Sequence, residues 1–411
     1  MKQNFGKRLL GALAAGFVTL ILCGPISGIR LDGYEFESQF KIPLLFAAAV
    51  TLLRLLSDFI PWERVQADSG ELQPGPERFG ALSRTAFALA IFLVAASLPL
   101  MGSKYLLSIS IVALIYVLLG LGLNVVVGFA GLLDLGFVGF FAVGAYGYAL
   151  GAKYLGLGFW GALPAAALTA GLFGAILGFP VLRMHGDYLA IVTLGFGEII
   201  RLVLNNWLDF TGGPNGVDAP PPTFLGWEFK RSATQGGTPF HEVFHLDYSP
   251  LYLDSFVYLA LLSVVGLSIY GVSRLRRMPI GRAWEALRED EIACRSLGLN
   301  HVAIKLSAFS IGASIGGLAG VFFAAYQGFV SPVSFTFFES ALVLAIVVLG
   351  GMGSLVGVVL AALFLTLLPE LLREFSDYRI LVFGIAMVLI MIWRPRGLIR
   401  MRRPYFPQEG A

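Results

Sequence analysis

Long apolar runs without any charged residue dominate this chain and decide what it can fold into. A helix that crosses a bilayer needs about 20 mainly apolar residues. Runs of about that length or longer occupy residues 9–29, 85–103, 105–133, 154–182 and 306–338. Only 13% of all residues are charged, about half of the share in soluble domains. We therefore predict an all-α integral membrane protein, built as a polytopic helix bundle.

Further segments bring the predicted number of membrane segments to about 12, within a range of about 10 to 12. The charge-free run 340–369 carries a Gly-rich stretch at 350–354, which favours two pieces over one helix. Segment 334–350 could be re-entrant, which is one source of the range. Weaker candidate spans are 42–60, 135–152, 188–205, 251–273 and 380–393.

Basic residues predict the orientation, because Lys and Arg concentrate in short cytoplasmic loops. The strongest basic clusters lie at residues 2–8, 274–282 and 394–403. These clusters place both termini in the cytoplasm, which requires an even number of spans. The same count places the Gly- and Pro-rich segment 207–250, with five acidic residues against Lys230 and Arg231, on the periplasmic face.

The N-terminal part of the chain is predicted to form a region of its own. Residues 9–29 imitate a secretory signal, but no small-x-small cleavage site follows residues 22–25, so we expect a first membrane helix. Residues 61–84 mix charges with Pro and Gly and predict a cytoplasmic linker. The domain prediction is two leading helices with a linker at 1–84 and a transmembrane domain at 85–411.

The chain lacks the motifs of an enzyme or an ATPase. It has no GxxxxGK[ST] loop, HExxH pair, nucleophile elbow or Cys/His cluster. Cys23 and Cys294 predict ordinary thiols, and His241 with His245 predicts a solvated loop pair rather than a metal site. We expect no catalytic residue, no cofactor, no metal and no nucleic acid partner.

Residues 279–298 are too charged to cross a bilayer, and they are patterned as an amphipathic surface helix. The apolar face is predicted to hold Ala283, Leu287 and Cys294, with Ala286, Ala293 and Leu297 beside them. The face toward water is predicted to hold Glu285, Arg288, Glu289 and Arg295. Gly298 predicts a left-handed stop, and Asn300 predicts an N-cap for the next helix. Such a helix acts either as a lever between two spans or as a plain connection.

Ionisable residues within apolar runs are costly, by about 2.5 to 3.5 kcal/mol at a helix centre on insertion scales, and need an explanation. Glu198 and Arg201 stand three residues apart and are expected to neutralise each other. Asp134 lies either near a helix end or in a broken helix. A weak similarity between 125–131 and 346–353 hints at an internal repeat.

Four motifs resemble one known family. They are GLGLNVVVG at 120–128, GDYLAIVTLGFGEI at 186–199, TGGPNG at 211–216 and the charged segment 281–298. In this order they are similar to the permease subunits of branched-chain amino acid ABC importers, and the resemblance covers most of the chain. It implies a multi-pass inner-membrane protein that carries Leu, Ile and Val by alternating access.

The resemblance also implies partners: a second permease subunit, two cytoplasmic ATPase subunits and a periplasmic amino-acid-binding protein. It makes 279–300 the cytoplasmic coupling helix, although Ile292 stands where the importer pattern has Glu. The expected ATPase-coupling residues are Arg282, Glu285, Ala286, Arg288, Glu289, Asp290, Ala293 and Gly298. The expected translocation-path residues are Asn124, Asp134, Gly195 and Glu198. The alternatives are a permease for another small solute such as a sugar, and an ion-coupled secondary transporter.

Overall fold

The computed structural model describes residues 29–32, 35–38, 92–101, 104–181, 184, 186–224, 227–229, 238–243, 248–371, 384–385, 388 and 397. The chain divides into two compact units, Met1–Leu89 with Leu368–Leu381 and Ala90–Leu367 with Val382–Ala411. The predicted leading spans, the linker 61–84, most of 380–393 and the basic clusters near both ends lie outside the described residues. The predicted domain boundary and the orientation of the termini therefore stay predictions.

In the first unit the structure describes a pair of short strands. Strand β1 (Ile29–Asp32) pairs antiparallel with β2 (Glu35–Ser38), with Ile29 opposite Ser38. These strands lie between the two predicted leading spans, where the sequence predicts a loop.

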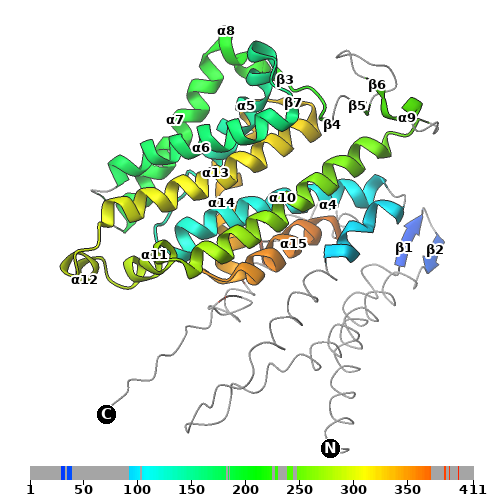
Figure 1. Cartoon of the computed structure of the whole chain (residues 1–411). Helices are drawn as coiled ribbons and strands as arrows, with labels where there is room; N and C mark the ends of the chain where they lie inside the picture. The colour runs from blue at the N-terminus through cyan, green and yellow to red at the C-terminus, as the bar shows by residue number, and fades with distance from the viewer. Residues whose placement is uncertain are drawn as a thin grey trace, which may run out of the picture. The chain divides into compact units, whose positions relative to one another are not determined.

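The second unit is a bundle of apolar helices (Figure 1). Six described segments are long and apolar enough to cross a membrane. Their helices, with the π-helix η3 that continues α4, are α4 (Lys104–Leu123), η3 (Asn124–Phe129), α6 (Phe159–Val181), α7 (Asp187–Asn206), α10 (Leu251–Arg277), α13 (His301–Gln327) and α14 (Phe337–Gly350). The shorter helices α5 (Val138–Leu155) and α15 (Leu355–Leu371) are also apolar. The helical membrane class is confirmed, and the number of twelve segments stays a prediction.

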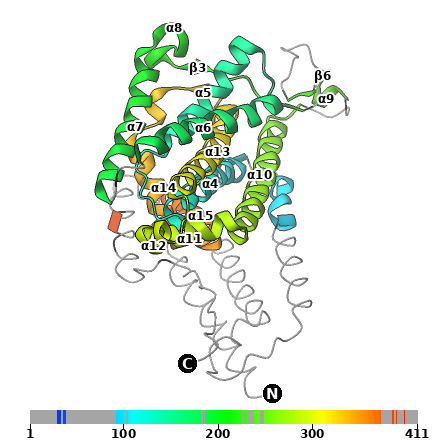
Figure 2. The same ribbon diagram turned by 60° about the vertical axis from the view of Figure 1, so that its left-hand side comes forward.

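Helix α13 is the centre of the second unit. It packs against α6, α5 and α4 (Figure 2). The approach to α5 is close, since a Cβ atom added at Gly144 would lie 2.1 Å from the carbonyl oxygen of Gly317. Small residues allow such contacts between membrane helices, where dispersion contributes much of the packing energy.

Two of the charge-free runs extend beyond the helices that they form. The run 306–338 contains most of α13, which ends at Gln327, where Gly328 adopts φ 69°. The chain then forms β7 (Phe329–Val330) and η5 (Pro332–Ser334) before α14 begins. The run 105–133 likewise leaves helical structure after Phe129. An apolar run shows what can be buried in lipid, but it does not locate a glycine turn.

The predicted break in 340–369 is confirmed, because α14 ends at Gly350 and α15 begins at Leu355. Helix α14 has 14 residues and rises about 21 Å at 1.5 Å per residue. That is less than the roughly 30 Å of a hydrocarbon core. Helix α14 therefore reaches the length of a membrane span only together with the residues that precede it, from Pro332 onward.

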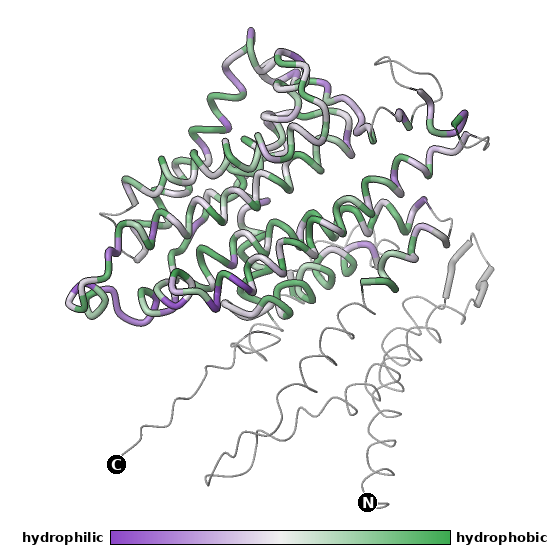
Figure 3. The backbone as a smooth tube through the Cα atoms, viewed as in Figure 1, coloured by the Kyte–Doolittle hydropathy of each residue, from purple (hydrophilic) through white to green (hydrophobic). Residues whose placement is uncertain are grey.

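Short elements cover one end of the bundle. They are η2 (Leu98–Met101), α8 (Leu208–Thr211), η4 (Gly213–Asn215), β3 (Val217–Asp218), β4 (Thr223–Phe224), β5 (Trp227–Glu228), β6 (Thr238–Pro239) and α9 (Phe240–Val243). Strand β3 pairs antiparallel with β7, β4 pairs antiparallel with β5, and β5 pairs parallel with β6. The opposite end carries α11 (Pro279–Glu289) and α12 (Glu291–Ser296), in which hydrophilic and hydrophobic residues are mixed (Figure 3).

Candidate functional site

The charged segment between α10 and α13 forms two helices, whereas the sequence analysis predicted one. Asp290 stands between α11 and α12 with an extended backbone. Its carboxylate accepts hydrogen bonds from the backbone N–H groups of Ile292 and Ala293, at 2.8 and 3.0 Å. An aspartate that caps a new helix in this way competes with continuation of the old one. The predicted stop at Gly298, with φ 79°, and the cap at Asn300 are both confirmed.

Helix α11 is fastened to the membrane helices by its apolar face. Trp284 is fully buried, and its indole N–H donates to the hydroxyl of Ser307 on α13 at 3.0 Å. Leu287 is buried one turn further on, as its place in the periodicity predicted. A Cβ atom added at Gly281 would lie 2.4 Å from the backbone of Arg276. Helix α11 is therefore part of the packed bundle and not a loose connection.

Two residues that were expected to face water are bonded within the protein. The guanidinium of Arg276 on α10 donates to the carboxylate of Glu285 at 2.9 Å. Arg288 donates to the backbone carbonyl of Gly128 in η3. The prediction failed because α11 lies against the ends of α10 and η3, so its polar face meets an arginine and a backbone carbonyl. Helical periodicity cannot reveal such neighbours.

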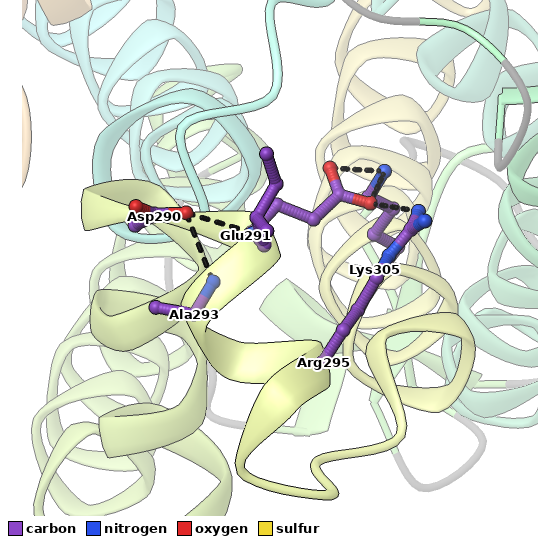
Figure 4. Close-up of polar contacts among 6 residues, drawn as sticks. Asp290, Glu291, Ala293, Arg295 and Lys305 are labelled. Carbon is purple, nitrogen blue, oxygen red and sulfur yellow. Dashed lines mark hydrogen bonds and ion pairs between the residues drawn. The ribbon is translucent and has the colours of Figure 1, made fainter.

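Helix α12 is fastened by charge (Figure 4). The Glu291 carboxylate lies 2.9 Å from the ammonium of Lys305 on α13 and 2.6 Å from the guanidinium of Arg295. Lys305 is only 1% exposed. Burial alone would raise the pKa of Glu291, but the hydrogen bonds and charges of Lys305 and Arg295 outweigh it, so the pKa lies below its usual value. We name Glu291, Arg295 and Lys305 the α12 clasp.

The sequence analysis did not identify the α12 clasp. The available signal was Lys305 itself, a charge that directly precedes the apolar part of a membrane helix. A lysine in that position either reaches the interface or pairs with an acid. Glu291 directly precedes the position where the importer pattern has Glu.

Beyond the clasp, α12 exposes large apolar side chains. Ile292 is 77% exposed and Leu297 is 80% exposed, whereas Cys294 is buried. Ala293 and Leu297 were expected beside the buried face, and both are exposed instead. The expectation was wrong because the break at Asp290 gives α12 a different orientation from α11.

Asn124 marks a junction between two helix breaks. Its side-chain carbonyl accepts a hydrogen bond from the backbone N–H of Gly353 at 2.9 Å. A Cβ atom added at Gly128 would lie 2.6 Å from that same nitrogen. The two similar segments 125–131 and 346–353 therefore meet in space. Single-turn π-helical geometry such as that of η3 often occurs at functional sites.

Asp134 lies in the irregular segment between η3 and α5, four residues before α5 begins. It is fully buried, and one of its oxygens accepts the N–H of Gly136 at 2.9 Å. The other oxygen has no partner among the described residues. The hydroxyl of Thr193 on α7 supports the same segment by accepting the N–H of Leu135 at 3.0 Å.

The remaining predicted path residues, Gly195 and Glu198, lie on α7, and Glu198 lines a small pocket together with Leu135 and Gly136, which directly follow Asp134. Glu198 and Arg201 form the expected ion pair at 2.7 Å, with each side chain about one third exposed. Gly195 lies on an exposed part of α7, and no atom lies within 4 Å of a Cβ atom added there. The structure therefore brings Asn124 and Asp134 into the buried interior, and it leaves Gly195 outside it.

Two of the cavities within the second unit carry charged side chains. One of about 920 Å³ lies beside β3 and the α5–α6 turn, and Lys153 and Asp218 are among its lining residues. The other, of about 290 Å³, lies between α4, α5, α13 and the start of α14. There the hydroxyl of Tyr116 donates to the carboxylate of Glu339 at 2.7 Å. The sequence analysis missed this pair, although Glu339 separates two charge-free runs and so met its own criterion for an intramembrane acid.

Comparison with known proteins points to one family. The family model described as "Branched-chain amino acid transport system / permease component" matches residues 105–391. A domain of unknown function matches residues 7–98. No solved structure matches the chain.

Three relatives carry the corresponding name. The high-affinity branched-chain amino acid transport system permease protein LivM of Escherichia coli K12 is 57% identical over 404 residues, covering 96% of this chain and 95% of the relative. LivM of Salmonella typhimurium shows the same identity and coverage. A probable LivM of Methanocaldococcus jannaschii is 26% identical over 260 residues, covering 57% of this chain and 66% of the relative. These similarities favour the branched-chain prediction over the sugar and ion-coupled alternatives.

Proposed function

This chain belongs to the branched-chain amino acid transport permease family, and from this we propose that it is the membrane permease subunit of an ATP-driven importer. It moves leucine, isoleucine and valine across the inner membrane by alternating access. It catalyses no reaction of its own. Separate ATPase subunits supply the energy.

The observation that carries this proposal is the two-part charged segment at one end of the bundle. Helix α11 is bonded to α10, to η3 and to α13, while α12 exposes Ile292 and Leu297. Exposed apolar side chains on a charged segment are typical of a surface that a partner covers. We propose that α11 and α12 together form the coupling segment, and that α12 is the part inserted into the ATPase.

The bonds of α11 offer a route by which motion reaches the path. Arg288 donates a hydrogen bond to the carbonyl of Gly128 in η3. Asn124 belongs to the same π-helix, and its side-chain oxygen accepts a hydrogen bond from the N–H of Gly353. Displacement of α11 therefore acts on both helix breaks at once. In the proposed cycle, ATP binding draws the coupling segments of the two permeases together and opens the path outward, and hydrolysis resets it.

Basic residues support the proposed orientation. Arg274, Arg276 and Arg277 occupy the last turn of α10, next to α11. Helix α13 has 27 residues and rises about 40 Å at 1.5 Å per residue, so β7 lies on the opposite face from α12. By the excess of basic residues in cytoplasmic loops, α11 and α12 are cytoplasmic and β3, β7 and α9 are periplasmic. Both termini are then proposed to be cytoplasmic.

The proposed partners follow from this arrangement. The coupling segment faces one of two cytoplasmic ATPases, and a second permease subunit completes the path. A periplasmic binding protein delivers the amino acid to the end that carries the 920 Å³ cavity. Asn124 and Asp134 remain the proposed polar groups near the helix breaks, and Glu198 is proposed to stabilise α7 through its ion pair.

The test is uptake of labelled leucine into vesicles that contain both permeases, both ATPases and the binding protein. We expect uptake to require ATP and every component, and to stop when this chain is omitted. Uptake that continues without the ATPases would show an ion-coupled transporter and contradict the proposal.

A further inference from the structure

The 290 Å³ cavity has a lining that suits a small molecule with one charged and one apolar end. Its apolar wall comes from the three helices α4, α5 and α13 and includes Ile115, Leu119, Val138, Phe141 and Phe323. Its polar groups gather around the start of α14: Tyr116, Tyr326, Gln327, Ser334 and Glu339. Ligand pockets commonly combine an apolar wall with a few polar groups that fix orientation.

The acidic group in this cavity is held in position and has no counter-ion within the described part of the chain. Glu339 lies in the first turn of α14, where the helix dipole favours a negative charge. Tyr116 on α4 donates to one of its oxygens at 2.7 Å. Glu198, Glu285 and Glu291 each take part in an ion pair, whereas no ion pair within the described part of the chain involves Glu339. A carboxylate within an apolar run needs a cationic partner, which a passing ligand can supply.

We propose that Glu339 binds the α-ammonium group of the amino acid in transit. Tyr116 positions the Glu339 carboxylate, and the apolar wall of the cavity contacts the aliphatic side chain of the amino acid. This inference rests on the proposed function and adds a binding site to it. A branched aliphatic amino acid has both features that this lining complements. The ammonium group is also what separates an amino acid from a sugar of similar size.

A rival explanation is that the Tyr116–Glu339 hydrogen bond only braces α4 against α14. Two conservative substitutions separate the explanations, because each explanation predicts a larger effect for a different one of the two variants. Glu339→Gln removes the charge but keeps an oxygen that can accept the hydrogen bond from Tyr116. Tyr116→Phe removes the hydrogen bond but keeps the carboxylate. Loss of a charged hydrogen bond to the ligand predicts the larger effect for Glu339→Gln, whereas a brace predicts the larger effect for Tyr116→Phe.

The experiment uses the whole transporter in vesicles, supplied with leucine-loaded binding protein, and measures leucine moved per ATP hydrolysed. We expect Glu339→Gln to lower this ratio by about tenfold or more, as loss of a charge-assisted hydrogen bond implies. Tyr116→Phe is expected to lower it by about two- to fourfold, because the carboxylate that binds the ammonium group is kept and loses only the hydrogen bond that positions it. ATP hydrolysis itself is expected to persist in both variants, because the coupling segment is unchanged.

Matched controls test whether the effect belongs to this cavity. Tyr146→Phe removes a buried hydroxyl that does not line the cavity. Asp209→Asn removes an exposed carboxylate from α8. Both variants are expected to move as much leucine per ATP hydrolysed as the unsubstituted transporter. Assembly of each variant is checked by co-purification of all subunits and by its ATP hydrolysis.

The outcomes separate this inference from the proposed function. If the unsubstituted transporter moves no leucine, the proposed function fails. If it moves leucine and Glu339→Gln moves it at the same ratio, the ammonium site alone is overturned. A larger loss in Tyr116→Phe than in Glu339→Gln also overturns it, in favour of the brace.

Discussion

Helices α11 and α12 follow each other directly in the chain, yet they are attached to the protein by different forces. Helix α11 buries Trp284 and Leu287 against the membrane helices. Helix α12 buries Cys294 and is held largely by the ion pair between Glu291 and Lys305. Burial is strong and insensitive to charge, whereas an ion pair depends on both partners being present and ionised.

This difference divides the segment into a base and a head. The base, α11, moves with the bundle because its side chains are part of the core. The head, α12, exposes Ile292 and Leu297 and stays attached through the α12 clasp. In the proposed function, the base transmits force to the bundle and the head presents the surface that contacts the ATPase.

Replacing the buried tryptophan of the base should have the largest effect. Trp284→Ala leaves a cavity and removes the bond to Ser307, and large-to-small changes of this kind cost about 3 to 5 kcal/mol. We expect a strongly lowered unfolding temperature of the purified permease pair. Trp284→Phe, which keeps most of the volume, should lose much less. Equal losses in the two variants would show that burial is not what holds α11.

Neutralising the α12 clasp should have the next largest effect. Glu291→Gln leaves Lys305 buried without its carboxylate, which costs about 3 kcal/mol, the lower end for a broken buried pair. The double variant Glu291→Gln with Lys305→Met removes both charges and should recover most of the loss. Thermal unfolding of Glu291→Gln, of Lys305→Met and of the double variant measures this coupling. A double variant no more stable than Glu291→Gln would contradict the ion pair as the main attachment.

The same carboxylate provides an independent test by pH. Because the pKa of Glu291 is lowered in the folded protein, its stabilising contribution is complete above the unfolded value of 4.5 and is lost as the pH falls through the folded value. The protection of the α12 amides from hydrogen exchange, measured relative to their intrinsic exchange rate at each pH, should therefore decrease on acidification in the unsubstituted protein. The Glu291→Gln variant should not show that dependence.

Changing the exposed surface of the head should disturb docking and leave the fold unchanged. Ile292→Ser with Leu297→Ser removes two exposed apolar side chains, each of which, in a partner interface, is expected to contribute about 1 to 2 kcal/mol. We expect weaker co-purification of the ATPases and slower leucine uptake, with an unaltered unfolding temperature. Leu299→Ser, a less exposed neighbour, serves as the control. Normal ATPase binding by the double variant would mean that docking lies elsewhere.

Removing the cap between the two helices should have the smallest effect. Asp290→Ala deletes the acceptor for two N–H groups, and loss of a cap costs about 1 kcal/mol. Faster hydrogen exchange is expected within α12 and not within α11. Asp290→Asn, which retains an oxygen acceptor, should behave nearly as the unsubstituted protein. Faster exchange in both helices would mean that base and head form one unit.

Part of the candidate site could be predicted from the sequence, because it depends on local pattern. Leu287, Cys294, Gly298 and Asn300 follow from periodicity and capping, and the structure places each as expected. Arg288 could not be placed, because its partner is a backbone carbonyl 160 residues away. The same holds for the bond between Asn124 and Gly353, which are 229 residues apart.

The sequence by itself determined the membrane class, the charged segment at one face, the absence of a Walker A phosphate loop and the family. Tertiary structure decided which residues of each apolar helix face inward and which charges meet, as with Glu291 and Lys305 or Tyr116 and Glu339. The physical reason is that lipid tails are as apolar as leucine, so the two faces of a membrane helix carry almost the same side chains. The helical periodicity of apolar residues distinguishes the buried face of a water-soluble helix from its exposed face. In a membrane helix it distinguishes the two faces only weakly.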